Sequence, residues 1–425
     1  MVSLVYLLLL PIGFVPILYL LTNAFYSKRR GLLRARIEAT PEEITILIPV
    51  HAQRPEVFAR CLDTVGAQGC AFVVVGDGVD EPYRALTQSH GGQFLALSEN
   101  QGKKVALRTG LAQVHTPYVL FVDSDVLLPA GAAVALARQM APGIGGVGAN
   151  LGAVETGRWV APAAEFVERS REVVLRAMST RGSVPYLDGA CVLHRTELIR
   201  PYVDSAEFVE MRVAGRPSRL GDDWQLTDFL LHAGYRTVKA YDVRVLVFPK
   251  ETARSFVRQN VRWARSNWIR LGAYFRRGFP RTAGRFYALE VTATYLVPII
   301  TLATLLLRLP LIAHALEGSS TDLRDVLVRL LPAVVGVPRN SWLSLVHFSS
   351  VILGAFATGS FVGAAMRTSA RPTLRLVAFG AVAMAIMFAT SIYGLVTFWV
   401  EPRWTGPATS DRPAPSRAVD ELPTP

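Results

Sequence analysis

Cysteine is scarce in this chain, with three residues in 425. The three cysteines have no metal-ligand spacing and make no even set, which argues against a structural zinc site and a disulfide framework. We interpret Cys61, Cys70 and Cys191 as small core residues of a protein in a reducing compartment. Internal repeats of solenoid length are also missing, so a repeat architecture is not expected.

Acidic residues are fewer than basic ones, 33 against 45, so the formal net charge is +12. Such an excess is typical of proteins that bind nucleic acid, anionic lipid or a phosphorylated substrate. The arginines lie beside apolar segments, which favours membrane lipid and substrate over nucleic acid. Hydrophobic residues make up 51% of the chain and the mean hydropathy is +0.31, which is high for a soluble enzyme.

Charge is missing altogether from residues 1–26, a run long enough to cross a bilayer as a helix. Lys28, Arg29 and Arg30 follow the run, whereas a signal peptide carries its positive charge in front. This order predicts an uncleaved transmembrane helix that anchors an integral cell membrane protein. The positive cluster places the following domain in the cytosol.

Between residues 40 and 250 the pattern becomes one of alternating strands and helices. The predicted strands are 44–50, 71–75, 94–97, 118–122, 187–193 and 243–248. The predicted helices are 54–65, 104–114, 165–178 and 220–233. This order argues for an α/β domain with a mostly parallel sheet and helices on both faces.

Residues 251–280 predict a basic amphipathic helix. Apolar residues recur at spacings of three and four from Val257 to Phe275, and arginines share another side from Arg254 to Arg265. A basic amphipathic helix that carries tryptophan lies naturally in the membrane interface. The alternative is an ordinary surface helix, but the apolar spans that follow directly favour the interface.

About three transmembrane helices are predicted within residues 286–400, at 286–307, 342–366 and 376–400. Arg367, Arg371 and Arg375 between the last two predict a cytosolic loop, which places the C-terminus outside. If the stretch 322–337 also crossed the membrane, the C-terminus would lie inside. The tail 401–425 is rich in Pro, Ala, Ser and charge, and we expect it to be disordered.

Two carboxylates, Asp123 and Asp125, stand at the end of the apolar strand 118–122. Residues two apart in an extended backbone point the same way, so both can face one point in space. Hard oxygen donors of this kind suit Mg²⁺ or Mn²⁺, with diphosphate oxygens completing the shell. An isolated pair would more often close a turn, but the surrounding motifs favour the metal.

Three further motifs follow predicted strands or begin helices. Asp77, between two glycines, can accept hydrogen bonds from a base or ribose. Lys103 and Lys104 open a helix, where free N–H groups attract a diphosphate. Gly189 lies in a small-residue stretch that allows a bulky acceptor to approach the backbone. For each motif a structural turn or close internal packing is the alternative.

An acidic pair, Asp222 and Asp223, begins the helix near residue 220. Capping explains one acidic residue there and does not require two. A carboxylate pair can raise one pKa and so create a base, and we assign Asp223 as the general base.

A QxxRW pattern, Gln259, Arg262 and Trp263, lies on the amphipathic helix. Arginine suits a diphosphate bidentately, and an indole offers a flat face for stacking on a sugar ring. The alternative is anchoring of Arg and Trp in lipid headgroups.

In this order the motifs resemble the membrane-embedded, processive family 2 glycosyltransferases, which include hyaluronan, chitin and cellulose synthases. Hyaluronan synthases and the chitin-oligosaccharide synthases of rhizobia are the most similar of these. The resemblance covers residues 44–270 by motif and the flanking spans by layout. QxxRW together with DxD and an acidic pair is a specific combination, whereas each part alone is not.

The resemblance implies a Rossmann-like GT-A catalytic domain with a UDP-sugar donor and a glycan acceptor. It implies that Asp77 contacts the uridine, helped by Pro49, His51 and Lys103. It also implies that Asp123 and Asp125 hold Mg²⁺ or Mn²⁺ with UDP. Asp223 would deprotonate the acceptor. The diphosphate and the acceptor sugar would bind the QxxRW residues Gln259, Arg262 and Trp263.

The hypothesis from sequence is therefore an inverting, processive transfer of sugar to a growing β-linked glycan at the membrane. A non-processive membrane glycosyltransferase that acts on a lipid or short glycan is one alternative. A non-catalytic membrane transport protein with a nucleotide-binding domain is another. Neither the sugar nor the oligomeric state follows from the sequence.

Overall fold

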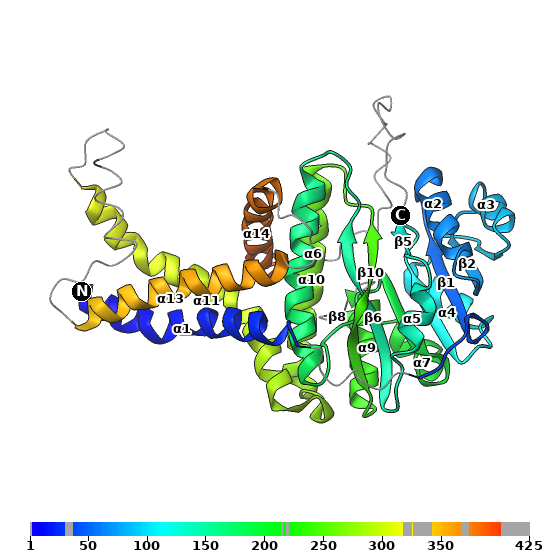
Figure 1. The fold of residues 1–425 in the computed structure, drawn as a ribbon, viewed down its shortest axis with the longest axis horizontal. Helices are drawn as coiled ribbons and strands as arrows, with labels where there is room; N and C mark the ends of the chain where they lie inside the picture. Colours follow the sequence, from blue (N-terminus) through cyan, green and yellow to red (C-terminus); the bar gives the residue numbers. More distant parts are fainter. Residues whose placement is uncertain are drawn as a thin grey trace.

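A computed structural model of the chain describes residues 2–29, 37–213, 216–217, 221–317, 325, 342–366 and 374–400. An α/β domain lies on one side and long apolar helices on the other, with helices α6 (Val160–Arg181) and α10 (Ala253–Arg277) between them (Figure 1). The predicted tail 401–425, the stretch 322–337 apart from Asp325, and the loop residues Arg367 and Arg371 lie outside the described residues.

The α/β domain is built on an eight-stranded sheet with the order β3-β2-β1-β4-β7-β6-β10-β5. Its strands are β1 (Ile44–Val50), β2 (Ala71–Asp77), β3 (Gln93–Leu97), β4 (Tyr118–Val122), β5 (Val126–Leu127), β6 (Ile144–Ala153), β7 (Cys191–Arg195) and β10 (Arg236–Val247). Strand β7 runs antiparallel to both β4 and β6, and β5 runs antiparallel to β10. The sheet is therefore mixed, where the sequence predicted a mostly parallel one.

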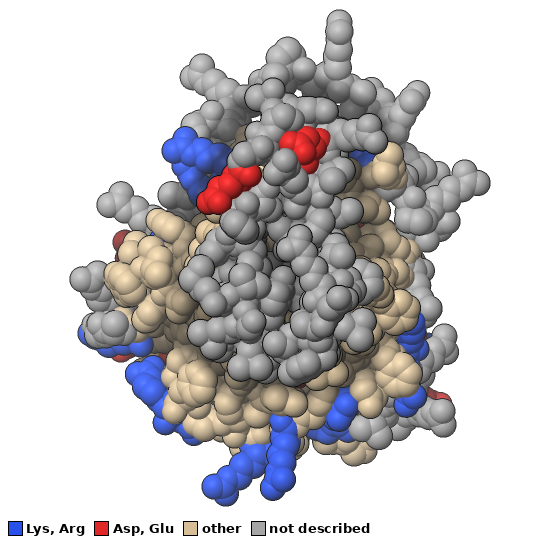
Figure 2. Space-filling view, turned by 90° about the vertical axis from the view of Figure 1, so that its left-hand side faces the viewer, with Lys and Arg blue, Asp and Glu red and all other residues tan. Residues whose placement is uncertain are grey.

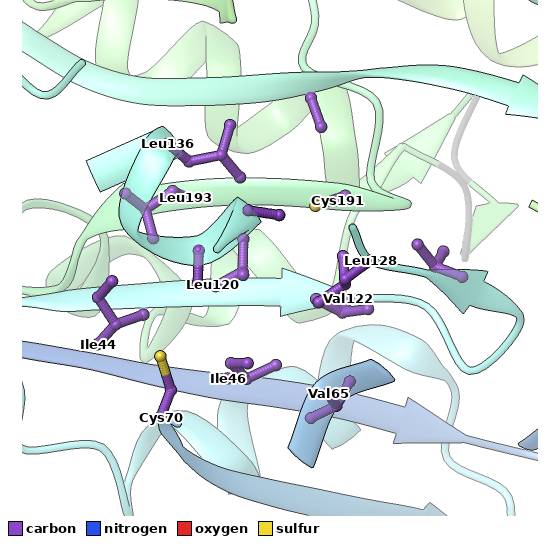
Figure 3. Packing of buried hydrophobic residues seen from close by; sticks show 14 of the residues in the cluster. Ile44, Ile46, Val65, Cys70, Leu120, Val122, Leu128, Leu136, Cys191 and Leu193 are labelled. Carbon is purple, nitrogen blue, oxygen red and sulfur yellow. The ribbon is translucent and has the colours of Figure 1, made fainter. Parts of the chain in front are cut away.

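Helices cover both faces of this sheet, as predicted. Helices α2 (Pro55–Gly66) and α5 (Ala132–Ala137) pack on one face. Helices α4 (Lys103–Leu111), α7 (Thr196–Val203) and α9 (Asp222–His232) pack on the other. Figure 3 shows the first core, where Ile46 and Leu120 of the sheet lie among helical side chains such as Val65. The shorter elements are α3 (Tyr83–Ser89), α8 (Ala206–Val209) and the hairpin of β8 (Arg212–Val213) with β9 (Arg216–Pro217).

Strand β6 was not predicted, although it lies inside the sheet. Its sequence, IGGVGANLGA, is rich in glycine, which is a poor strand former. Neighbouring side chains fill the space that these glycines leave: a Cβ on Gly146 would lie 2.6 Å from Leu187, and one on Gly148 would lie 3.1 Å from it. Close packing, which sequence pattern does not show, therefore explains this strand.

Three helical segments are long and apolar enough to cross a membrane, namely Arg281–Thr304, Ser349–Met366 and Leu374–Leu395. The first begins in the short 3-10 helix η2 (Arg281–Ala283) and continues into α11 (Gly284–Leu316), and the others lie in α13 (Trp342–Met366) and α14 (Leu374–Leu395). Helix α1 (Val2–Tyr26) packs along α11 and α13. Seen from the end at which α1, α11 and α13 point towards the viewer, Lys and Arg side chains lie around the edge of the face (Figure 2). These features indicate a membrane protein.

Candidate active site

A cavity of about 1980 Å³ lies between the sheet and the apolar helices. Twelve of the thirteen candidate residues from the sequence line it, and only Lys104 does not. They come from the ends of β1, β2 and β4, from the starts of α4 and α9, from the loop before β7, and from α10. The twelve are Pro49, His51, Asp77, Lys103, Asp123, Asp125, Gly189, Asp222, Asp223, Gln259, Arg262 and Trp263.

Lys103 is the first residue of α4 and joins three parts of the site. Its Nζ lies 2.6 Å from Asp123 Oδ1 and 3.1 Å from Asp222 Oδ2, and donates to the Gly189 carbonyl at 3.3 Å. Burial would lower the pKa of this ammonium, but Asp123 and Asp222 outweigh it and raise the pKa above its usual value. A fixed positive charge thus lies among the carboxylates.

Lys104 points elsewhere, although it is the next residue. Its Nζ is buried against the Phe208 ring, 5.7 Å from the centroid, and has no hydrogen-bond partner among the described residues. Burial lowers the pKa of Lys104 to about 8. The structure therefore does not bring this predicted substrate-binding residue to the cavity.

Asp77 shapes the loop that leads into α4. Its two carboxylate oxygens accept the backbone N–H groups of Gln101 at 2.7 Å and Gly102 at 2.9 Å. The His51 ring donates from Nδ1 to the Asp77 carbonyl at 2.6 Å, and its Nε2 accepts from Asn100 at 2.9 Å. The side chain of Asp77 therefore orders the rim of the cavity that it lines.

Asp123 and Asp125 fit a divalent cation that is also held by a phosphorylated ligand. Both follow β4 and line the cavity. Burial and the neighbouring Asp123 raise the pKa of Asp125, which is the situation that a bound cation would relieve. Within the part of the chain that the structure describes, no cluster of three or more His, Cys, Asp or Glu could hold a metal. A site with only two carboxylates suits Mg²⁺ or Mn²⁺, because these ions leave the other positions of their coordination shell to phosphate oxygens and water.

The acidic pair begins α9 behind Gly221, whose φ is +89°. A Cβ on this glycine would lie 2.1 Å from Trp224 Nε1, so both the backbone and the indole require glycine. Burial and the adjacent Asp222 raise the pKa of Asp223 to about 6. Burial opposes the ionisation of Asp222, but Lys103 and Lys104 outweigh it and lower the pKa of Asp222. The two carboxylates thus have different proton affinities, which suits a base beside a permanent anion.

Helix α10 brings the QxxRW side chains to the cavity, where they meet residues that the sequence did not single out. Arg171 on α6 lies over the Trp263 ring, with Cζ 5.0 Å from the centroid. Glu168, Tyr186 and Asp188 also line the cavity. From the sequence, only a charged helix over 165–178 was predicted here. Helical spacing does not reveal that Glu168 and Arg171 are partly buried and face the cavity.

Comparisons with known proteins show which family the chain belongs to. Residues 26–266 match a family described as "Glycosyltransferase like family 2". An N-acetylglucosaminyltransferase of Azorhizobium caulinodans is 27% identical over 347 residues, 76% of this chain and 80% of the relative. One of Bradyrhizobium diazoefficiens is 28% identical over 244 residues, 54% of this chain and 50% of the relative.

Among solved structures, the mannosyltransferase PcManGT of Pyrobaculum calidifontis, in complex with GDP-Man and Mn²⁺, has a similar fold. The TM-score is 0.56 at 17% identity, over 84% of this chain and 98% of that one. This likeness supports the GT-A fold that the sequence predicted. The family match spans more than half of the chain, including the DxD pair and QxxRW, and argues against a non-catalytic transport protein. The chain belongs to glycosyltransferase family 2 and is a hexosyltransferase.

Proposed function

We propose that this enzyme transfers N-acetylglucosamine from UDP-N-acetylglucosamine, with inversion, to a growing β-linked glycan at the cytosolic face of the membrane. The sugar is taken from the names of the relatives. One observation supports processive extension towards the membrane: the cavity continues from Asp223 to residues of the apolar helices, such as Thr301 on α11 and Phe361 on α13.

In this mechanism Asp223 accepts the proton of the acceptor hydroxyl as that oxygen attacks the anomeric carbon and the bond to UDP breaks. Lys103 and Arg262 supply positive charge for the departing diphosphate. Mg²⁺ or Mn²⁺, held by Asp123 and Asp125, would neutralise part of the same charge. Trp263 supports the acceptor ring, which keeps the hydroxyl near Asp223 between turnovers.

The apolar end of the cavity favours a second candidate, transfer to a lipid acceptor. The threonine hydroxyls there donate to carbonyls of their own helices: Thr294 to Glu290 at 2.9 Å, Thr301 to Val297 at 2.8 Å, and Thr358 to Gly354 at 2.9 Å. Hydroxyls used in this way offer a sugar no free donor. An alkyl chain would fit such a lining as well as a glycan does.

The product distinguishes the two candidates. The purified full-length protein would be incubated with a panel of UDP-sugars and Mn²⁺, with and without membrane lipid extract, and released UDP and product mass would be measured. A ladder of masses spaced by one N-acetylhexosamine supports processive synthesis, and a single sugar on a lipid supports the second candidate. Release of UDP from none of the donors would refute both.

The adjacent lysines should behave very differently on substitution. Lys103→Met removes the cation among Asp123, Asp222 and the expected diphosphate, so we expect UDP release from UDP-N-acetylglucosamine to fall about 100-fold or more. Lys104→Met replaces a buried ammonium that does not line the cavity and acts on the site only through the pKa of Asp222. Its effect on the rate should therefore be much smaller, within about tenfold. Equal losses in the two variants would contradict this placement.

A further inference from the structure

Arg171 is the centre of a partly buried cluster beside the QxxRW tryptophan. Its Nη1 donates to both carboxylate oxygens of Glu168, at 3.0 and 2.9 Å, and its Nη2 to Asp188. Its Nε donates to the Tyr186 hydroxyl at 3.3 Å. Its Cζ also lies 5.0 Å from the centroid of the Trp263 ring and 5.4 Å from that of the Tyr186 ring.

The same cluster continues to the catalytic centre. Asp188 also accepts from Lys239 Nζ at 2.8 Å, so its carboxylate is held by two cations. The next residue, Gly189, accepts from Lys103, which in turn contacts Asp123 and Asp222. A Cβ on Gly189 would lie 3.2 Å from Lys103 Nζ. A continuous set of contacts thus joins the indole to the acidic pair.

We propose that Arg171 is a positioning residue for the acceptor: it holds the plane of the Trp263 ring at a fixed place relative to Asp223. This inference rests on the proposed function, because it assigns Trp263 to the acceptor sugar. A planar guanidinium stacks on an aromatic face and forms several directed hydrogen bonds, which an ammonium cannot reproduce. The indole would otherwise choose among several rotamers at the edge of a large cavity.

The test is Arg171→Lys, which keeps the positive charge beside Glu168 and Asp188. With chitobiose as acceptor and UDP-N-acetylglucosamine as donor, we expect the KM for chitobiose to rise about five- to tenfold. The KM for the donor, and UDP release without acceptor, should stay within about twofold. A purely structural role would instead change both substrates together.

The matched control is Arg169→Lys on the same helix. Arg169 pairs with Glu165 at 2.5 Å and does not line the cavity, so its KM for chitobiose should not change. In a Trp263→Leu background, Arg171→Lys should have no further effect on the acceptor KM. An unchanged acceptor KM in Arg171→Lys of an active enzyme would refute the positioning role alone. An inactive wild-type enzyme would refute the proposed function.

A separate observation concerns α14, which packs on α6 and α10 and runs across the direction of α1, α11 and α13 in Figure 1. Near its start, Arg375 donates to the Gly157 carbonyl at 2.6 Å. Just past its end, Arg265 of α10 donates to Thr397 Oγ1 at 3.1 Å and to the Val400 carbonyl at 3.2 Å. Both ends of α14 therefore contact the layer that α6, the loop before it and α10 form next to the α/β domain.

Between these ends the contact with that layer is close. A Cβ on Gly380 would lie 2.4 Å from the Phe166 ring, and one on Gly394 would lie 2.7 Å from Ala264. The Trp268 indole donates to the Ser391 carbonyl at 2.9 Å. A helix of 22 residues rises about 33 Å, close to the hydrocarbon thickness. A membrane-crossing helix of this length would carry one of its ends away from this layer.

We infer that α14 lies in the plane of the membrane on the side of the α/β domain, with its exposed apolar face against lipid. Leu374, Val377 and Val382 are 85%, 40% and 46% exposed on α14. The chain then leaves Val400 on the same side as the α/β domain. This inference opposes the expectation from sequence that the C-terminus lies outside.

Protease protection in sealed inside-out membrane vesicles tests this placement, with one epitope tag after Pro425 and another before Met1. We expect protease to remove the C-terminal tag together with the α/β domain and to leave the N-terminal tag intact until detergent is added. Protection of the C-terminal tag, while the α/β domain is digested, would show that α14 crosses the membrane.

Discussion

Replacing Asp223 with asparagine is expected to lower kcat by about two to four orders of magnitude while the affinity for UDP stays nearly unchanged. The amide keeps the size of the side chain and can still accept from the Trp224 N–H, which lies 2.8 Å from Oδ1. It cannot take a proton from the acceptor. Steady-state UDP release would give kcat, and calorimetry would give UDP affinity.

The matched control is Asp228→Asn, on the same helix. Asp228 is largely buried but does not line the cavity, so its kcat should stay within about twofold of wild type. A fully active Asp223→Asn enzyme would show that another group is the base.

The acidity of Asp223 adds a pH dependence to the same assignment. Its pKa is raised to about 6, first by burial and then by Asp222. A base must be ionised to act, so the rate should be constant above about pH 7 and fall as the pH decreases through 6. A pH profile of kcat for the wild type, with no such decrease, would contradict a role for this carboxylate.

The second large effect is expected at the DxD pair: Asp125→Ala should abolish the UDP binding that depends on Mn²⁺. Asp123 and Asp125 are the carboxylates at the end of β4 that face the cavity, and Mg²⁺ or Mn²⁺ is usually bound through one or two carboxylates plus phosphate oxygens. Loss of one of two protein ligands leaves too few for tight binding. Calorimetry of UDP with and without Mn²⁺ measures the effect directly.

Asp80→Ala is the control for that experiment, because Asp80 pairs with Arg84 at 2.6 Å and does not line the cavity. Its binding of UDP with Mn²⁺ should equal that of wild type. Unchanged metal-dependent binding in Asp125→Ala would count against the assigned metal site and would leave the base assignment intact.

The secondary structure that carries each motif could be predicted from the sequence, because each motif lies on a single strand or helix. An apolar run followed by two acids determines a strand with carboxylates at its end, and this is β4. The 3.6-residue period of Arg and apolar residues predicts the amphipathic helix that is α10. These local patterns, together with the family resemblance that added Pro49 and His51, gave twelve residues that line one cavity.

Other features depend on packing between elements, which local periodicity does not contain. Adjacent residues on a helix point about 100° apart, so only the tertiary placement of α4 decides that Lys103 enters the cavity while Lys104 lies on Phe208. Strand β6 exists because its glycines admit side chains from neighbouring segments.

Two features of the protein follow from the tertiary structure alone. Arg171 contacts Trp263 although the two residues are 92 apart in sequence, and α14 lies on α6 and α10 although its hydropathy suits a membrane span. Hydropathy measures how readily a segment leaves water, and it carries no direction relative to the bilayer. Sequence by itself therefore determined which groups this enzyme has for chemistry. Contacts between distant segments decided where each group points, because their energies depend on shapes that come together only after folding.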